Sequence, residues 1–451
     1  MEIVVQANKT VQAILKNKNK GIGENRMSCY SVDVPVDEGV LLYNTLTTEM
    51  VLLTEAEWEN RLENQYLKDH WFTVPQETNE KEFADLVRWV LTTRKKKEEA
   101  ITGYTIFPTT DCNARCFYCF ELGRSRIPMT ADTAHKVAQY IKDHCRGEKV
   151  KINWFGGEPL FNQEAIDIIS QDLRESGVEF VSRAISNGYL FDAATVKKAV
   201  ESWNMKQVQI TLDGTEAVYN KVKAFIYRQG SPYQVVMENI GHLLDASVGV
   251  AIRLNMDMHN AENLLELVAD LAARFEGRKG LSVYAHHLFD SVKPMADIHS
   301  EEEWELRDEA MCRLNDFIRQ HGLALKQGVR KTPKMNFCMA DSGKAVTILP
   351  GGEIGLCEHF SESEFIGHID QEGFDQAVVN SWKERIPEIP ECADCFYYPA
   401  CSQLKKCSSG SVCFKQLRLE HRRKTEQQMR CEYEMWKNKM PEASEDEVEL
   451  C

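Results

Sequence analysis

Residues 104–120 read YTIFPTTDCNARCFYCF, an apolar run followed by three cysteines with the spacing C-x3-C-x2-C. The apolar run, Tyr104–Phe107, is typical of a β-strand. The cysteines are Cys112, Cys116 and Cys119. Three thiolates on one short loop can hold three irons of a cubic [4Fe–4S] cluster, which normally has four thiolate ligands. The motif therefore predicts a cluster with one open iron; the alternatives are a zinc knuckle and three unrelated thiols.

The composition indicates two or three domains and a cytoplasmic protein. The chain has 451 residues, 43% of them hydrophobic, and no segment reaches the ~18 consecutive apolar residues that a membrane-spanning helix needs. The first residues do not resemble a secretion signal. A formal net charge of −15 disfavours nonspecific binding to nucleic acid or anionic lipid. We therefore expect no nucleic-acid partner and no membrane partner.

The cysteines favour metal binding over a disulfide framework. There are fifteen, an odd number, and ten of them fall in two groups at 112–119 and 338–413. A long chain without a secretion signal is also an unusual setting for a disulfide-rich protein.

Strand-like and helix-like segments alternate between Gly103 and Gln320, which predicts an α/β fold with a parallel sheet covered by helices. The expected strands are Tyr104–Phe107, Lys151–Trp154, Phe180–Ile185, Gln207–Leu212, Val250–Asn255 and Ser282–His286. The expected helices are Ala131–Arg146, Gln163–Glu175, Ala193–Trp203, Tyr233–Ala246 and Ala261–Phe275. Sites on barrels built this way lie at the C-terminal ends of the strands.

Polar motifs stand at these strand ends. They are Gly156-Gly157-Glu158-Pro159 after the second strand, Ser186-Asn187-Gly188 after the third and Asp213-Gly214 after the fourth. Together with the cysteine triplet they resemble the radical S-adenosylmethionine (SAM) enzymes. The resemblance implies a partial (β/α)6 barrel in which the open iron binds the amino and carboxylate groups of SAM. Reductive cleavage of SAM would then give a 5′-deoxyadenosyl radical that abstracts hydrogen from a C–H bond.

The resemblance also implies a set of SAM contacts. The candidates are Tyr118, Gly156, Gly157, Glu158, Ser186, Asn187, Asp213, Lys223, Arg253 and Asn255. The glycines would let backbone groups approach a ligand, and Glu158 offers a carboxylate to the ammonium group of SAM. Lys223 stands where many relatives carry an arginine, and it lacks the bidentate guanidinium fork. Ordinary turns and polar residues at a barrel mouth are the alternative explanation for these residues.

A second cysteine group resembles the SPASM domain, which holds two auxiliary [4Fe–4S] clusters. It reads C-x13-G-x4-C from Cys338 to Cys357 and C-x2-C-x5-C-x5-C-x5-C from Cys392 to Cys413. By position, the resemblance assigns Cys392, Cys395, Cys401 and Cys413 to the distal cluster, and Cys338, Cys357 and Cys407 to the proximal one. Paired zinc sites are the alternative.

The proximal set departs from the SPASM pattern, because no cysteine lies a few residues upstream of Cys338. Its cluster would then have three protein thiolates and a free iron able to bind a substrate thiolate. Cys312 or Cys431 is an alternative fourth ligand.

The segment before the barrel predicts strands at Tyr30–Val34, Gly39–Leu42 and Met50–Leu53, followed by helices. A capping box, Thr54-Glu-Ala-Glu57, opens a helix expected to reach Leu67, and Glu80–Thr92 is a second helix. This layout is similar to the winged-helix-like recognition element of peptide maturases, which would bind a leader segment as an added strand. The alternative is a cap that binds nothing.

The expected organisation is an N-terminal extension at 1–26, the recognition element at 27–95, the radical SAM core at 101–325, the SPASM domain at 326–440 and an acidic tail at 441–451. A charged helix, Phe414–Asn438, is expected to pack beside the SPASM domain.

The combination resembles maturases of ribosomally made peptides, and it implies thioether formation between a peptide cysteine and a carbon atom. The implied cofactors are SAM and three [4Fe–4S] clusters. The implied partners are a precursor peptide with a leader and an external one-electron donor such as flavodoxin or ferredoxin. The alternatives are carbon–carbon crosslinking, formylglycine formation, epimerisation, or a non-enzymatic iron–sulfur or zinc protein.

Overall fold

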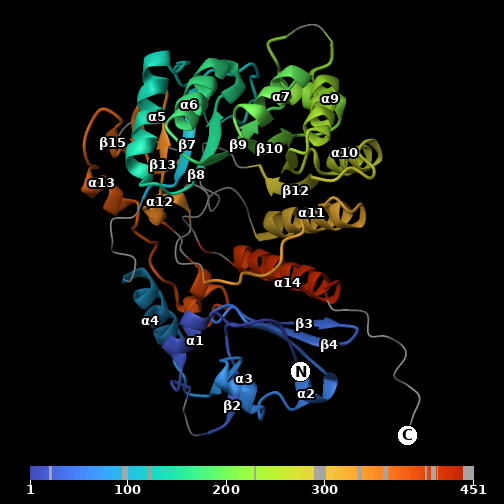
Figure 1. The fold of residues 1–451 in the computed structure, drawn as a ribbon. Helices are drawn as coiled ribbons and strands as arrows, with labels where there is room; N and C mark the ends of the chain where they lie inside the picture. The colour runs from blue at the N-terminus through green and yellow to red at the C-terminus, as the bar shows by residue number, and fades with distance from the viewer. Residues whose placement is uncertain are drawn as a thin grey trace, which may run out of the picture.

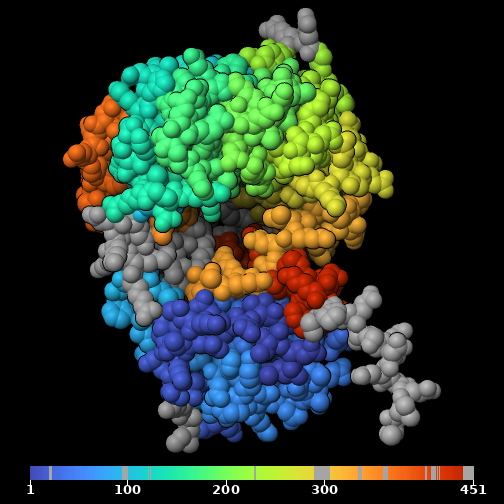
Figure 2. Space-filling view, viewed as in Figure 1, coloured from blue at the N-terminus to red at the C-terminus, as the bar shows by residue number. Residues whose placement is uncertain are grey.

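The structure is a computed structural model with two bodies joined by C-terminal segments. It describes residues 1–19, 23–93, 100–119, 121, 123–227, 230–288, 301–333, 338–358, 364–401, 404–407, 413 and 415–439. A barrel-like body lies at the top of Figure 1 and the N-terminal module at the bottom. In the space-filling view, orange and red C-terminal segments fill the space between them (Figure 2). The expected acidic tail lies outside the described residues.

Six parallel strands form the barrel sheet in chain order, which confirms the predicted α/β sheet. They are β7 (Gly103–Thr109), β8 (Val150–Gly156), β9 (Phe180–Ser186), β10 (Met205–Leu212), β11 (Gly249–Met256) and β12 (Leu281–His287). The helices that cover them are α5 (Ala131–Cys145), α6 (Gln163–Glu175), α7 (Ala193–Glu201), α9 (Pro232–Asp245) and α10 (Ala261–Arg274). Every predicted strand and helix of this region is present within a few residues.

Three elements of the barrel were not predicted. They are the 3-10 turn η1 (Pro159–Asn162) and the helices α8 (Glu216–Lys223) and α11 (Glu301–Gln320). The first two are short, so neither carries a long helical period. α8 nevertheless positions a buried lysine of the site.

The two faces of the barrel sheet differ because strand side chains alternate. One face carries Trp154, Ile210 and Ile252, which are fully buried in the core beneath the helices. The other, inner face carries polar residues such as Arg253 and Tyr284, which are only partly buried. The inner face therefore has the polarity of a ligand site.

The sheet continues beyond the barrel. β13 (Ala345–Ile348) pairs parallel with β7, and β14 (Glu353–Gly355) and β15 (Gly367–His368) follow antiparallel, giving nine strands among the described residues. The short helices α12 (Met339–Ser342) and α13 (Gln376–Ser381) flank them, and the 3-10 turns η4 (Pro390–Cys392) and η5 (Tyr398–Ala400) lie further along the chain. The segment expected to be a separate domain from residue 326 thus shares a sheet with the barrel.

The described part of the N-terminal module contains the three predicted strands and three that were not predicted. The sheet order is β1-β5-β4-β3. Its elements are β1 (Glu2–Val5), α1 (Lys9–Leu15), β2 (Asn25–Met27), β3 (Ser31–Val36), β4 (Gly39–Asn44), β5 (Met50–Leu53), α2 (Glu55–Glu59), α3 (Gln65–Asp69), β6 (Thr73–Pro75) and α4 (Glu80–Thr93). β1 pairs antiparallel with β5. The stretch 1–26, expected to be an extension, therefore includes an edge strand of this sheet.

The capping box at the start of α2 is present, since the Thr54 side chain accepts from the Glu57 backbone amide and Glu57 caps in return. The helix ends at Glu59 and not near Leu67. A second helix, α3, begins after Asn64, whose side chain caps it. The expected single helix is therefore two short ones, because Asn64 satisfies a new helix start.

The long C-terminal helix packs against the N-terminal sheet in addition to the expected cysteine-rich segment. α14 (Lys415–Lys437) places Met429 and Tyr433 against Val5, Val32 and other apolar residues of the N-terminal sheet. Phe414, its expected first residue, lies outside the described residues. α14 also contacts the cysteine-rich segment, as expected: the rings of Tyr397 and His421 stack with centroids 4.0 Å apart, and Lys331 Nζ lies 2.8 Å from Glu432 Oε1. No helix in the described part of the chain is both long and apolar enough to cross a membrane.

Candidate functional site

The predicted cysteine triplet lies on the loop after β7, and the fold brings the three thiols together. Burial raises the pKa of Cys112 to about 12, and the charges of Glu158, Cys116 and Cys119 add to the rise. The backbone amide of Ala114 donates to Cys112 Sγ at 3.3 Å. Such N–H donors to sulfur accompany iron–sulfur clusters.

The two glycines at the end of β8 pack closely against the cysteine loop, and their contact with SAM stays a prediction. A Cβ on Gly157 would lie 2.2 Å from Asp111 O, and one on Gly156 would lie 2.3 Å from Thr109 O. Gly156 also has a φ of +117°, which other residues rarely adopt. The backbone amide of Glu158 donates to Asp111 O at 2.9 Å. Because these glycines have no side chain, the turn after β8 can pack directly against the backbone of the cysteine loop.

Glu158 is fully buried between β8 and β9. Its carboxylate accepts from Ser186 Oγ at 2.8 Å, from the Asn187 amide at 2.8 Å and from the Leu160 amide at 3.3 Å. Burial nevertheless raises its pKa to about 7. The side-chain amide of Asn187 donates to Asn113 Oδ1 at 2.6 Å, beside Cys112. Ser186 and Asn187 thus position Glu158 and the cysteine loop.

A second polar group forms at the ends of β10 and β11. Lys223 Nζ lies 3.1 Å from Asp213 Oδ2 and donates to Tyr118 Oη at 2.9 Å. Tyr118 Oη in turn donates to Asp213 Oδ1 at 2.7 Å, and Asn255 Nδ2 to the same oxygen at 3.3 Å. Four predicted residues from distant parts of the chain therefore meet here.

Lys223 is tied to the cysteine loop by its backbone, because the Arg115 amide donates to Lys223 O at 2.8 Å. Burial by itself would lower the pKa of Lys223, but the charges of Asp213, Tyr118 and Cys116 outweigh it and hold the pKa well above its usual value. Lys223 is therefore a charged, nearly inaccessible cation next to the triplet.

Arg253, also predicted as a SAM contact, lies apart from this group. Its Nη2 is 3.1 Å from Nδ1 of His286 on β12. Burial, followed by the charge of Arg253, lowers the pKa of His286 to about 4, so the imidazole is neutral.

The residues at the barrel mouth fit SAM and a cluster. Three thiols converge, a carboxylate and an ammonium group lie beside them, and Asn255 Oδ1 is buried with no hydrogen-bond partner among the described residues. An acceptor without a partner suits a hydroxyl or amino group of a ligand.

Four thiols of the second cysteine group lie near one another. Burial raises the pKa of Cys395, and the charges of Cys401, Cys413 and Cys392 raise it further, so these four thiols are neighbours. Arg418 Nη1 donates to Cys413 Sγ at 3.7 Å. Cys392 and Cys395 also pack against the N-terminal module.

Two thiols of the set assigned to the proximal cluster, Cys338 and Cys407, are neighbours in the structure. Desolvation raises the pKa of Cys338, and the charge of Cys407 adds to it. Cys357 and Cys407 both pack against the barrel core. The two alternative ligands lie elsewhere: Cys312 is near Arg423 and Asp308, and Cys431 is near Glu432.

No three His, Cys, Asp or Glu side chains of the described residues converge closely enough to hold one metal ion. The thiolates of a cubane bind separate irons and are spaced more widely than the ligands of a single ion.

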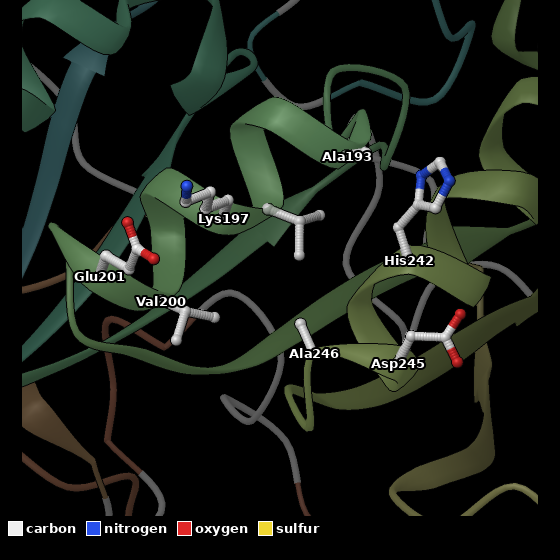
Figure 3. A pocket seen from close by; sticks show the side chains of 8 residues that line it. Ala193, Lys197, Val200, Glu201, His242, Asp245 and Ala246 are labelled. Carbon is white, nitrogen blue, oxygen red and sulfur yellow. The ribbon is translucent and has the colours of Figure 1, made fainter.

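A pocket of about 440 Å³ lies on the outside of the barrel between α7 and α9. Figure 3 shows Lys197, Glu201, His242 and Asp245 around it. These residues are far along the chain from every cysteine motif, and none of them belongs to the polar groups at the strand ends.

The sequence model of the family described as Radical SAM superfamily matches residues 106–272, the stretch from β7 to α10. The chain contains a radical SAM domain. Such a domain indicates an enzyme that uses SAM and a [4Fe–4S] cluster. The cysteine triplet at 112–119 and the Gly-Gly-Glu-Pro motif at 156–159 lie inside the matched residues.

Curated relatives are distant. An uncharacterised protein of Methanocaldococcus jannaschii is 23% identical over 267 residues, covering 58% of this chain and 86% of that protein. The GTP 3′,8-cyclase of Rhodopirellula baltica is 30% identical over 121 residues, covering 25% of this chain and only 32% of the cyclase. The match to the cyclase thus spans about a third of that protein.

Solved structures share the fold over most of the chain. anSMEcpe with bound AdoMet has a TM-score of 0.54 at 14% identity, covering 75% of this chain and 98% of that one. Streptococcus suis SuiB bound to its precursor peptide SuiA has a TM-score of 0.51 at 14% identity, covering 84% and 95%. At these identities the likeness establishes the fold alone.

Proposed function

We propose that this radical SAM enzyme forms thioether bonds in a ribosomally made precursor peptide. The observation that carries the proposal is the grouping of ten cysteines into three sets, one at the barrel mouth, one on the barrel core and one against the N-terminal module. SuiB, which shares the fold, is described with a precursor peptide, and anSMEcpe with the peptide Cp18Cys. A substrate that contacts all three cysteine sets would have to be a flexible chain such as a peptide.

In this proposal the barrel mouth holds SAM, which supplies a 5′-deoxyadenosyl radical when it is cleaved. Glu158 accepts hydrogen bonds from the amino group of SAM, while Ser186 and Asn187 keep its carboxylate in place. Lys223 draws the carboxylate of SAM toward the cysteine loop. The ring of Tyr219, fully buried 5.8 Å from Lys223 Nζ, keeps water away from that charge.

The proximal set, Cys338, Cys357 and Cys407, would hold one auxiliary cluster and the distal set the other. Three thiols leave one place for a peptide cysteine, which would lose its proton there. The product has a C–S bond in place of one C–H and one S–H bond, so each crosslink removes two hydrogens. The deoxyadenosyl radical would take the hydrogen atom of the C–H bond, the thiol would lose a proton, and the electron left over when the C–S bond forms would pass to the auxiliary cluster. A donor of the flavodoxin or ferredoxin type supplies the electron that cleaves SAM.

The N-terminal module would bind the leader as an added strand. Its sheet has the edges β1 and β3. The β3 edge is engaged by α14, since Arg430 Nη1 donates to Pro35 O at 3.1 Å, whereas Ile3 on β1 is 42% exposed. The leader therefore pairs alongside β1. Hydrogen exchange of residues 2–5 should slow when a leader peptide binds; faster exchange would mean that the leader displaces β1.

Mass spectrometry tests the chemistry. The anaerobically reconstituted enzyme is incubated with SAM, a reductant and the peptide encoded beside its gene. Thioether formation predicts a loss of two hydrogens per crosslink and cysteines that resist alkylation. Loss of hydrogens with free thiols would support a carbon–carbon bond, and a peptide whose cysteine becomes formylglycine would contradict the proposal.

A control variant tests whether the cysteine triplet is needed for the cleavage of SAM. The triple substitution of Cys112, Cys116 and Cys119 by alanine should abolish 5′-deoxyadenosine formation. Persistence of 5′-deoxyadenosine in that variant would remove the triplet from the mechanism.

A further inference from the structure

The inner face of the barrel carries two arginines that no carboxylate neutralises among the described residues. Arg183 on β9 donates through Nε to Asn153 Oδ1 at 3.1 Å. Arg253 on β11 contacts His286, and its Nε is buried with no hydrogen-bond partner among the described residues. In a chain of net charge −15, such unpaired cations are unexpected. Arg183 is exposed, whereas Arg253 is partly buried. The guanidinium of Arg253 has lost part of its hydration without gaining a carboxylate from the described residues, which favours an anion from outside.

The position of Arg253 separates it from the group around Lys223. Strand pairing aligns Arg253 with Tyr284 of β12, and Asn255 with His286. Asn255 reaches toward β10, where it meets Asp213, whereas Arg253 reaches the other way, to β12. No residue of the cysteine loop contacts Arg253 through any hydrogen bond or ion pair of the described residues. The two cations of the mouth thus serve different sides of β11.

The surroundings of Arg253 are polar and positive. Tyr284 Oη donates to Gln209 Oε1 at 2.8 Å, across the small side chain of Ala251. Burial raises the pKa of Tyr284, and the nearby charges of Arg253 and Arg183 oppose the rise. From α14, Lys424 also faces His286, and the carboxyl of Glu420 lies among Lys424, Asp308 and Arg423. The carboxyl groups of Glu420 and Asp308 lie beside Lys424 and Arg423, and neither forms an ion pair with Arg253 in the described part of the chain.

We propose that Arg253 binds a carboxylate of the peptide substrate on the β11–β12 side of the barrel mouth, where His286 and Tyr284 lie beside it. Arg253 is only partly buried, so the accessible part of its guanidinium can pair with a carboxylate that enters the barrel mouth. The carboxylate belongs to an aspartate or glutamate near the reacting cysteine, or to the end of the peptide. The proposal rests on the proposed function in taking the substrate to be a peptide, and it removes Arg253 from the SAM contacts.

The first experiment measures the dissociation constant of SAM by equilibrium dialysis with full-length, reconstituted protein. Lys223→Gln should bind SAM about tenfold more weakly, while Arg253→Gln should bind it nearly as well as the wild type. Arg274→Gln is the matched control, since Arg274 lies on α10 outside the sheet, 3.5 Å from Asp270. Weakening by Arg253→Gln equal to that by Lys223→Gln would make Arg253 a SAM contact and overturn the proposal.

The second experiment uses calorimetry with three synthetic probes in the presence of SAM. They are acetyl-Gly-Cys-Gly-Asp-Gly-amide, its Asn counterpart as an amide, and the Asn peptide with a free C-terminus. A carboxylate should improve affinity about tenfold, in the Asp probe for a side-chain source or in the free-ended probe for a terminal one. Arg253→Gln should erase the preference and Arg253→Lys should restore part of it. Equal affinities for all three probes on the wild type would overturn the proposal.

Binding is measured here without turnover, so failure to form thioethers would leave this result intact. Iron content and the visible absorption of each variant show whether it has folded around its clusters, and Arg253→Lys provides a second variant where Arg253→Gln fails to fold.

Discussion

The carboxyl group of Glu158 shows how burial tunes one residue for its task. It has no exposed surface, and three protein donors hold it, yet burial still raises its pKa to about 7. A carboxyl in this state is half ionised at neutral pH and ready to be fully ionised by an arriving ammonium group.

This pKa predicts a pH-dependent affinity for SAM. The ionised form binds the ammonium group, and because the pKa is raised, that form disappears as the pH falls through about 7. SAM should therefore bind about tenfold more weakly at pH 6 than at pH 8. Equilibrium dialysis across this range checks the prediction. Glu158→Gln should bind weakly with a flat profile, and an equally steep profile in that variant would assign the effect elsewhere.

The pair of Lys223 and Asp213 predicts a large cost for removing one partner. Their side chains are 4% and 2% exposed. Lys223→Met leaves the buried Asp213 carboxylate without its counter-ion and should cost about 3–5 kcal/mol of unfolding free energy. Lys198→Met is the matched control, because Lys198 and Asp167 form a pair that is 38% and 36% exposed and should contribute less than about 1 kcal/mol. Urea denaturation measures both, and similar costs would refute the argument.

At the scale of elements, the turn after β8 is held against the loop after β7 by two glycines. The sequence predicted the strand and the motif, because alternating apolar residues and a short polar tetrapeptide are local features. It did not predict that both glycines pack closely against the backbone at Thr109 and Asp111. A contact between two loops that are about 45 residues apart in the chain cannot be predicted from the local sequence of either loop.

Gly157→Ala should therefore disturb the cysteine loop. The added Cβ would fall 2.2 Å from Asp111 O, so the loop must move. We expect a cost of about 1–3 kcal/mol and incomplete iron incorporation, measured by denaturation and by iron analysis after reconstitution. Gly241→Ala on α9 is the control, because nothing lies within 4 Å of its added Cβ. Full iron content in Gly157→Ala would count against the packing role.

At the scale of the whole molecule, α14 joins the two bodies. Its later residues pack on the N-terminal sheet, and its earlier part carries Arg423, which pairs with Asp308 of α11. This charged helix of 23 residues has no strong apolar stripe, so its contact with the N-terminal sheet could not be predicted from its own pattern.

Met429→Ala should loosen this connection selectively. Met429 is fully buried between α14 and the sheet, so its truncation should cost about 2–5 kcal/mol. Hydrogen exchange should then accelerate in β3 and β1 while β7–β10 keep their protection. Leu419→Ala on the same helix is the control, since Leu419 is 42% exposed. Uniform acceleration over the whole chain would show that the two bodies unfold together.

The sequence by itself determined the order of strands and helices in the barrel, the capping box of α2 and the spacing of the cysteine motifs. Each of these depends on neighbours within one turn, one strand or one loop. Only the tertiary structure decided that β1 lies beside β5, that β13 extends the barrel sheet, and that Lys223 is paired while Arg253 is not. Strand partners and ion pairs depend on distances through space between segments far apart in the chain, and the energy of a buried charge depends on which groups surround it.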